Sequence, residues 1–251
     1  MDIVLLGSGN VATHLGDALV QAGHRITQVY SPTEAHAQAL ADPLGAAAIN
    51  HPTAIDVQAD IYIIAVKDDV LATVAAQLPN TLRGTVVHTA GSVDMAVLAA
   101  HTANYGVLYP VQTFSKAKAV DFSTIPLAVE ASGEAALARL EELAGSLSKR
   151  VFRCDSKQRL SLHTAAVFAC NFTNHFYTIA ADILNEHGLE FDLIRPLILE
   201  TAQKVMEHAP KDAQTGPAVR NDRHTMEKHL ALLEANPALA KLYRLISERI
   251  R

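Results

Sequence analysis

Four polar side chains lie within an otherwise apolar segment, HTAAVFACNFTNHF, at positions His163, Asn171, Asn174 and His175. If the segment is a helix that turns about 100° per residue, and His163 is taken as zero, Asn174 lies at about 20°, Asn171 at about 80° and His175 at about 120°. The polar side chains therefore share one arc. Three aromatic side chains occupy the neighbouring arc: Phe168, Phe172 and Phe176.

This combination of side chains fits the reduction of a C=O or C=N group, because a proton must be given to the atom on which charge develops. Histidine is the side chain best matched to that task at neutral pH. We therefore expect His163 to be the acid, Asn171 and Asn174 to orient the substrate, and His175 to contribute to the binding wall. His88 is the second candidate acid. The alternative is structural, with the four groups bonded to neighbouring helices or to a second subunit.

The segment QTGPAVRND contains a further candidate, Arg220. Its Gly-Pro pair is typical of a turn, and Asp222 can cap the helix that follows. Arg220 is therefore either part of a helix connection or a clamp that binds a substrate carboxylate through two hydrogen bonds.

A glycine turn near the N-terminus, in IVLLGSGNVATHLGDAL, has the spacing Gly7-x-Gly9-x-x-Ala12. It follows an apolar run and opens a helical pattern, which is the context that a dinucleotide-binding turn requires. The first glycine permits the tight turn, the second lets the backbone approach a pyrophosphate, and the small residue at position 12 allows close packing. We expect the whole turn to bind the cofactor through residues Gly7, Ser8, Gly9, Asn10 and Val11, although a plain strand-to-helix turn also uses glycine.

The end of the second apolar run favours NADP over NAD. An NAD site usually has an acidic residue there for the ribose 2′-hydroxyl, but this sequence has Ser31 in QVYSPTEA. Ser31 and Thr33 could both bind a 2′-phosphate through their hydroxyl groups. No arginine is adjacent, so NAD stays the alternative cofactor.

Polar residues also follow three later strand-like runs, in AVKDD (65–69), HTAGS (88–92) and YPVQTF (109–114). Ligands of open parallel sheets bind at the carboxyl ends of the strands. These stretches should therefore border one pocket, with Val66 and Lys67 next to the cofactor.

The elements that must position these residues alternate between short β-branched runs and Ala/Leu-rich helical patterns. The runs are at 3–6, 26–30, 46–49, 61–66, 85–88, 106–109, 127–130 and 150–152; the helical patterns are at 11–21, 34–41, 70–78 and 134–147. This order predicts an α/β fold, a doubly wound and mostly parallel sheet with helices on both faces.

After residue 153 only helical patterns remain. Asp155 and Gln158 predict a capping box, and the helix can continue to Gly188. Asp192 and Asp222 are expected to cap the next two helices, and Asn236-Pro237 should open the last. The chain is thus predicted to have a dinucleotide-binding domain, 1–153, and an all-helical domain, 154–251, for substrate binding and dimerisation.

Composition narrows the class of protein. The 251 residues are 49% hydrophobic with a net charge of -5, and no basic stripe is present, so nucleic acid is not an expected partner. No apolar run approaches the length of a membrane span. The two cysteines and twelve histidines show no metal-ligand spacing. A cytoplasmic protein without a metal site, a disulfide or a signal peptide is the simplest expectation.

Together the motifs resemble a known family. The glycine turn, AVKDD, HTAGS, GVLYPVQTFS, QRLSLHTAAVFACNFTNH, LETAQKV and QTGPAVRND are similar to those of Rossmann-like NADP oxidoreductases with a C-terminal domain of unknown function. More distantly the chain resembles pyrroline-5-carboxylate reductase, the deazaflavin-dependent NADP oxidoreductases and the 6-phosphogluconate/β-hydroxyacid dehydrogenases. The resemblance implies an NADP-binding domain and a helical domain that builds a homodimer.

Two departures from the dehydrogenase pattern affect the expected chemistry. The catalytic Lys-x-x-Asn of those enzymes corresponds here to Asn171-x-x-Asn174, which has no lysine. Their carboxylate-binding Pro-Val-Ser loop corresponds to Pro110-Val111-Gln112-Thr113, so the resemblance makes Gln112 and Thr113 substrate-binding candidates. We therefore expect an NADP-dependent oxidoreductase that acts on a small carbonyl or imine bound between the domains. The alternative is a non-catalytic NAD(P)-binding sensor.

Overall fold

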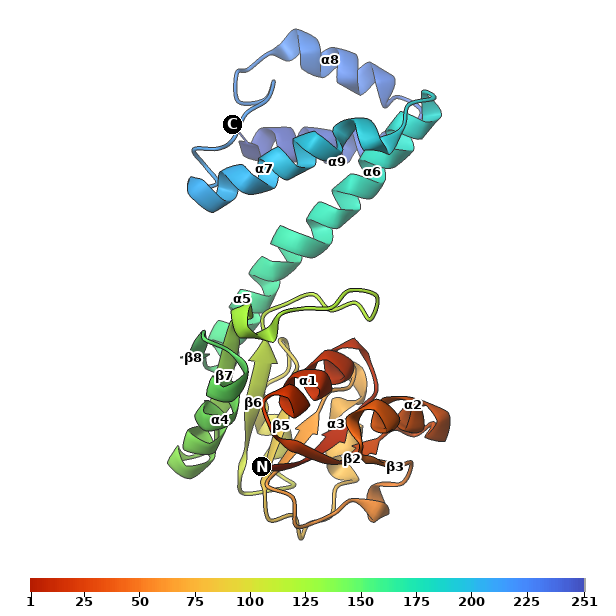
Figure 1. The fold of residues 1–251 in the computed structure, drawn as a ribbon. Helices are drawn as coiled ribbons and strands as arrows, with labels where there is room; N and C mark the ends of the chain where they lie inside the picture. Colours follow the sequence, from red (N-terminus) through yellow and green to blue (C-terminus); the bar gives the residue numbers. More distant parts are fainter. Residues whose placement is uncertain (251) are drawn as a thin grey trace. The chain divides into compact units, whose positions relative to one another are not determined.

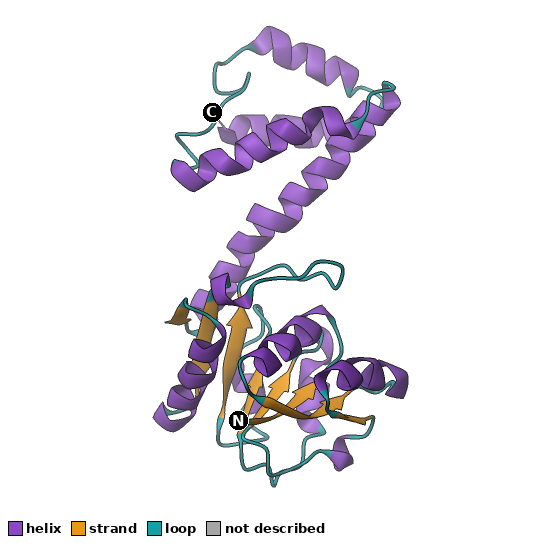
Figure 2. Cartoon of the chain, viewed as in Figure 1, coloured by secondary structure: helices purple, strands orange, loops and turns teal. Residues whose placement is uncertain are grey.

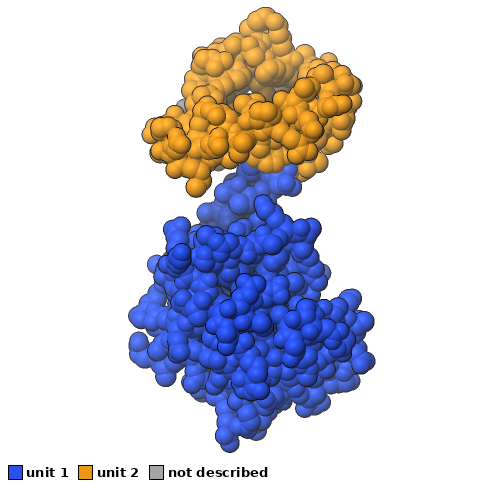
Figure 3. Space-filling view, in the orientation of Figure 1, with its two compact units in different colours: residues 1–174 blue, residues 175–251 orange. Residues whose placement is uncertain are grey.

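The computed structural model describes residues 1–250, which form two compact units (Figures 1 and 3). The first unit is Met1–Asn174, and the second begins at His175. Strands occur only in the first unit of the part described, as Figure 2 shows. No helix within residues 1–250 is both long and apolar enough to cross a membrane.

The first unit is built on one eight-stranded sheet in the order β3-β2-β1-β4-β5-β6-β7-β8. All neighbouring strands are parallel except β6 and β7. The chain builds outward from β1 to β3 and then crosses back to place β4 beside β1, which makes the β1/β4 boundary a topological switch point. The strands are β1 (Asp2–Leu6), β2 (Arg25–Tyr30), β3 (Ala47–Ile49), β4 (Ile61–Ile64), β5 (Thr85–His88), β6 (Tyr105–Pro110), β7 (Leu127–Ala131) and β8 (Val151–Arg153).

Helices cover both faces of the sheet, and the alternation of side chains along each strand explains this. In β1, Ile3 and Leu5 belong to one core cluster, whereas Val4 and Leu6 belong to the other. Both faces of a parallel strand must therefore be covered. The helices α1 (Asn10–Gln21), α2 (Glu34–Leu44) and α4 (Glu134–Leu147) contribute to the first cluster, and α3 (Asp68–Ala76) to the second.

The predicted strands and helices of this unit are confirmed, with shifts at their ends. The fourth strand ends at Ile64, and α3 begins at Asp68, two residues earlier than the predicted helix. Two acidic residues, Asp68 and Asp69, lie in the first turn of α3. Their charges complement the positive end of the helix dipole, which favours this earlier start.

The helical run after β8 begins with the predicted capping box. Asp155 accepts a hydrogen bond from the Gln158 amide at 2.7 Å, and Gln158 accepts one from the Asp155 amide at 3.0 Å. The run consists of α5 (Ser156–Ala166), a π-helical segment (Val167–Phe172) and α6 (Thr173–Glu186). It stops before Gly188, whose φ of 68° is in the left-handed region. The π-helical segment was not predicted.

The second unit continues with α7 (Arg195–Glu207), α8 (Arg223–Leu232) and α9 (Pro237–Ile250). Asp222 caps α8 through the Thr225 amide at 3.1 Å, and Asn236 accepts from the Leu239 amide of α9 at 3.0 Å, as predicted. The prediction for Asp192 is wrong. This residue lies inside a short 3-10 turn (Phe191–Ile194) and pairs with Arg195 at 2.5 Å, and α7 starts only after that turn.

Candidate functional site

The glycine turn connects β1 to α1 at the switch point of the sheet. Gly7 has a φ of 123°, and a Cβ atom on it would lie 2.3 Å from the carbonyl oxygen of Ala65, at the end of β4. The Gly7 amide donates to the Tyr30 oxygen of β2 at 2.8 Å. Both the conformation and the close approach of β4 therefore require glycine at this position.

The next glycine leaves the start of α1 open. Gly9 precedes α1 in an extended conformation, without a side-chain cap. A Cβ atom built on it would meet nothing within 4 Å. No side chain at position 9 therefore blocks the approach to the start of α1, as the phosphates of a dinucleotide require.

A cavity of about 790 Å³ opens in front of this turn, and it fits a dinucleotide. Its walls come from the ends of β1, β2 and β4 and from α3: Gly7, Ser8, Gly9, Asn10, Val11, Tyr30, Ser31, Pro32, Ala65, Val66, Lys67, Val70, Thr73, Val74 and Gln77. None of these lining residues is acidic, and Lys67 supplies a positive charge. The absence of a carboxylate from this lining agrees with a cofactor that carries a 2′-phosphate.

All but one of the predicted cofactor residues line this cavity. The exception is Thr33, which is exposed and directly precedes α2. Ser31 is buried, and the Ser8 hydroxyl donates to its hydroxyl at 3.3 Å. Lys116 is a further residue of this region that no local motif predicted: its ammonium donates to the Ser8 carbonyl at 3.1 Å from a loop 108 positions further along the chain.

A second cavity, of about 290 Å³, lies beyond the ends of β5 and β6. Three stretches that the sequence marked as pocket borders meet there: Asp68; Thr89, Ala90 and Gly91; and Tyr109 to Phe114. Val11 and Val66 line both cavities, so the two are adjacent. The helical run adds His163, Ala166, Val167, Cys170 and Asn171.

A tyrosine-histidine pair lies in the wall of this second cavity. The hydroxyl of Tyr109 is 3.1 Å from Nδ1 of His163, and the rings meet edge to face. The pair is held on the other side by Gly91, since a Cβ atom there would lie 2.6 Å from the same Nδ1. Burial raises the pKa of Tyr109, although the nearby charge of Arg159 acts in the opposite direction. The hydroxyl is therefore protonated at neutral pH and can donate to His163.

The charge of the second cavity is carried by one carboxylate. Asp68 lines it and accepts a hydrogen bond from the hydroxyl of Ser92. No lysine or arginine is among its lining residues. Within residues 1–250, no group of three or more His, Cys, Asp or Glu side chains could hold a metal ion.

The structure separates the four polar residues of the opening motif. His163 and Asn171 line the second cavity, whereas Asn174 and His175 do not. Asn174 is exposed, and His175 lines a different hollow, within the second unit. Asn174 is 11 residues beyond His163, about 16 Å along a helix axis, which is too far for so small a cavity.

His88 is fully buried beneath the site and does not line either cavity. Burial lowers its pKa to about 4, and the charge of Arg159 adds to this effect. Its Nδ1 accepts from the Ala90 amide at 3.2 Å. The imidazole is therefore neutral at pH 7, and its absence from the lining of both cavities argues against His88 as the acid.

The remaining candidates are in different places. Gln112 and Thr113 line the second cavity, although the side-chain Oε1 of Gln112 already accepts from the Thr113 amide at 2.8 Å. Arg220 is exposed in the turn before α8, in the second unit. Its role as a carboxylate clamp stays a prediction.

Comparison with known proteins agrees with this geometry. Residues 2–108 match the family "NADP oxidoreductase coenzyme F420-dependent", and residues 125–250 match a domain of unknown function, DUF2520. The crystal structure of the "putative NADP oxidoreductase BF3122" from Bacteroides fragilis is 46% identical and covers 99% of this chain and 97% of its own, with a TM-score of 0.90. No curated protein matches the chain.

More distant structures share the fold. An imine reductase from Myxococcus stipitatus in complex with NADP+ is 19% identical, with a TM-score of 0.69 over 100% of this chain and 93% of its own. A reductive aminase from Aspergillus terreus in complex with NADPH and ethyl-5-oxohexanoate is 16% identical, with a TM-score of 0.75 over 99% of this chain and 92% of its own. The chain belongs to the Rossmann-type NADP oxidoreductase family in which the dinucleotide-binding domain is followed by the domain of unknown function DUF2520.

Proposed function

We propose that the protein is an NADPH-dependent reductase of a small imine, with a small carbonyl compound as the second substrate class. The observation that carries the proposal is the Tyr109–His163 pair in a cavity adjacent to the dinucleotide cavity. The reduced nicotinamide, when bound, supplies a hydride. The protein must then bind the acceptor and provide a proton, and both functions are assigned to the second cavity.

The proton donor in this proposal is His163. In this proposal the protonated hydroxyl of Tyr109 donates to Nδ1, so the imidazole proton is assigned to Nε2. As Nε2 gives its proton to the imine nitrogen, Nδ1 can take the proton of Tyr109, and the resulting tyrosinate then regains a proton from solvent. Asn171 and Gln112 are amides on the same wall and orient the substrate without adding charge.

The preference for an imine comes from Asp68. An imine becomes cationic when protonated, and a nearby carboxylate favours that form. A carboxylate substrate would meet Asp68 and no lysine or arginine among the residues that line this cavity. If Arg220 bound the substrate, it would favour a substrate that carries a carboxylate. Activity with an uncharged and with a carboxylate-bearing imine therefore distinguishes the role of Asp68 from that of Arg220.

The test begins with fluorescence titrations of NADPH and NADH. NADPH oxidation is then followed with a cyclic imine such as methylpyrroline and with its carboxylate counterpart. We expect tighter binding of NADPH, oxidation with the uncharged ring, and loss of turnover in His163→Ala and Tyr109→Phe. His224→Ala, which changes an exposed histidine of α8, is the control. Tight NADPH binding without oxidation by any imine or carbonyl compound would favour the sensor instead.

We further propose that residues 154–251 form the substrate and dimerisation domain, and that a second copy of this chain covers the helical unit. No side chain in α6, α7 or α8 is buried. Leu193 and Leu197 are each 65% exposed, and Met206 is 84% exposed. Exposed apolar surface on this scale marks an interface.

A further inference from the structure

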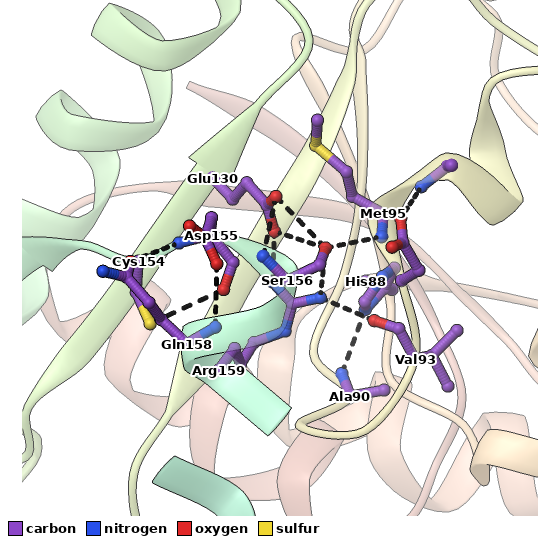
Figure 4. A network of polar contacts seen from close by, with 12 residues as sticks. His88, Ala90, Val93, Met95, Glu130, Cys154, Asp155, Ser156, Gln158 and Arg159 are labelled. Carbon is purple, nitrogen blue, oxygen red and sulfur yellow. Dashed lines mark hydrogen bonds and ion pairs between the residues drawn. The ribbon is translucent and has the colours of Figure 1, made fainter. Parts of the chain in front are cut away.

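Arg159 is the largest side chain with complete burial in the first unit, and it is held by three acceptors. Its guanidinium donates to a carboxylate oxygen of Glu130, to the Val93 carbonyl at 2.6 Å and to the Ser156 hydroxyl at 3.1 Å. Figure 4 shows that these groups converge from β7, from the loop after β5 and from the first turn of α5. Glu130 is nearly buried, with 14% of its side chain exposed.

Ser156, at the start of α5, is also hydrogen-bonded both to β7 and to the loop after β5. Ser156 donates to Glu130 from its amide at 2.9 Å and from its hydroxyl at 2.8 Å. Its hydroxyl also accepts from the Met95 amide at 3.1 Å. The start of α5 is therefore fixed to β7 and to residues 93–95 by charged hydrogen bonds.

Such a network is weak support for stability by itself. The loss of hydration when a charged pair is buried can exceed the attraction between the charges, and an apolar replacement is often equally stable. A buried pair can instead select one geometry among several. The question is which geometry this pair selects.

Each of the residues Arg159, Val93 and Glu130 is close in the chain or in the sheet to one residue of the proposed proton-donating site. Arg159 is four residues before His163, one turn earlier on the same helix face. Val93 is two residues after Gly91, against which the His163 ring lies. Glu130 is opposite Val107 in the β6/β7 ladder, two residues before Tyr109.

We infer that the Arg159–Glu130 pair is a positioning device that holds His163, Tyr109 and Gly91 in one geometry. The inference rests on the proposed function, in which His163 gives the proton. Arg159 lines neither cavity and so acts through the other residues. Burial raises the pKa of Tyr109, and the charge of Arg159 offsets part of that rise.

The test compares Glu130→Gln, Arg159→Lys and the double variant Arg159→Met/Glu130→Leu. The double variant removes both charges and keeps the volume apolar, so it should fold even if a single variant does not. The matched control is Arg153→Lys/Glu141→Gln, which changes an exposed ion pair between β8 and α4. With methylpyrroline as substrate, we expect kcat to fall at least tenfold in the double variant, with KM and the Kd for NADPH within threefold of wild type.

A second readout does not depend on turnover. Nitrogen NMR of the His163 ring, assigned through His163→Gln, should show one tautomer with a hydrogen-bonded Nδ1 in the wild type and an averaged tautomer in the double variant. If wild-type NADPH oxidation is absent but the tautomer changes, the proposed function fails and the positioning role stands. A folded double variant with unchanged kcat and an unchanged tautomer would overturn the inference, and so would a loss confined to NADPH binding.

Discussion

The contact between Gly91 and His163 allows the site to be perturbed without changing any polar group. A Cβ atom at position 91 would lie 2.6 Å from Nδ1, 2.8 Å from Cγ and 3.0 Å from Cβ of His163. Ordinary contacts between such atoms are about 3.5 Å or longer, so Gly91→Ala must displace the ring by about 1 Å. The bond from Tyr109 to Nδ1, now 3.1 Å, would then be weakened or lost.

Two effects of Gly91→Ala can be separated. Overpacking of this kind costs about 1–3 kcal/mol of the free energy of unfolding. In a protein of this size each kcal/mol lowers Tm by about 2–4 °C. A 1 Å displacement of a catalytic group can lower the rate by about 100-fold. We therefore expect a modest decrease in Tm, a large decrease in kcat for imine reduction and an unchanged Kd for NADPH.

The control for Gly91→Ala is Gly145→Ala, in α4. A Cβ atom at Gly145 would meet nothing within 4 Å, and the position is inside a helix. Alanine there should raise the free energy of unfolding by up to about 1 kcal/mol and leave kcat unchanged. If Gly91→Ala retained wild-type kcat while its Tm fell, the placement of His163 against Gly91 would not matter for the reaction, and the assignment of His163 would have to be withdrawn.

Three further predictions concern other parts of the chain. His88 has a pKa of about 4 in the folded protein against 6.5 when unfolded, so the unfolded chain binds more protons between these values and stability is lost as pH falls through that window. Urea unfolding from pH 7 to pH 4 should therefore show an acid-induced loss about 3 kcal/mol smaller in His88→Gln than in the wild type; equal losses would contradict the buried neutral state. Ser31→Asp should weaken NADPH binding at least tenfold relative to NADH in fluorescence titrations, because a carboxylate would repel the 2′-phosphate; an unchanged ratio would place that phosphate elsewhere. Leu197→Glu should shift the mass measured by light scattering from dimer toward monomer, and a wild-type mass that is already monomeric would refute the proposed dimer.

Local patterns were sufficient to predict the fold from the sequence. Each strand is a short run of mainly β-branched or apolar residues, and the central strands β4 and β5 are entirely buried because helices cover both faces of the sheet. The glycine turn could also be predicted from the sequence, because its spacing follows from one tight turn and one helix start. Contacts between residues far apart in the chain could not be predicted. Tyr109 and His163 are 54 positions apart, and Ser8 and Lys116 are 108 apart.

Arg159 shows a different reason for a missed residue. An arginine in the first turn of a helix, after a capping box, is usually solvated, and its neighbours Gln158 and Leu160 are exposed here. The parallel pairing of β7 with β8, in which Val129 lies opposite Arg153, brings Glu130 to the start of α5. Local sequence gives no sign of this contact, because Glu130 and Ser156 are 26 positions apart in the chain.

Only part of the predicted polar arc of the helical run lines the second cavity. With His163 at zero, Val167 lies at about 40° and Cys170 at about -20°, and both line the second cavity beside His163. The same calculation puts Asn174 at about 20°, yet Asn174 is not in the wall, because an angle gives no position along the axis. The π-helical segment also changes the angle between successive side chains, because its backbone hydrogen bonds span five residues. The Thr173 hydroxyl spans the same interval, since it donates to the Phe168 carbonyl at 3.2 Å. Cys170 and Asn171 lie inside this wider turn, so a regular helix is a poor guide to two of the residues that line the second cavity.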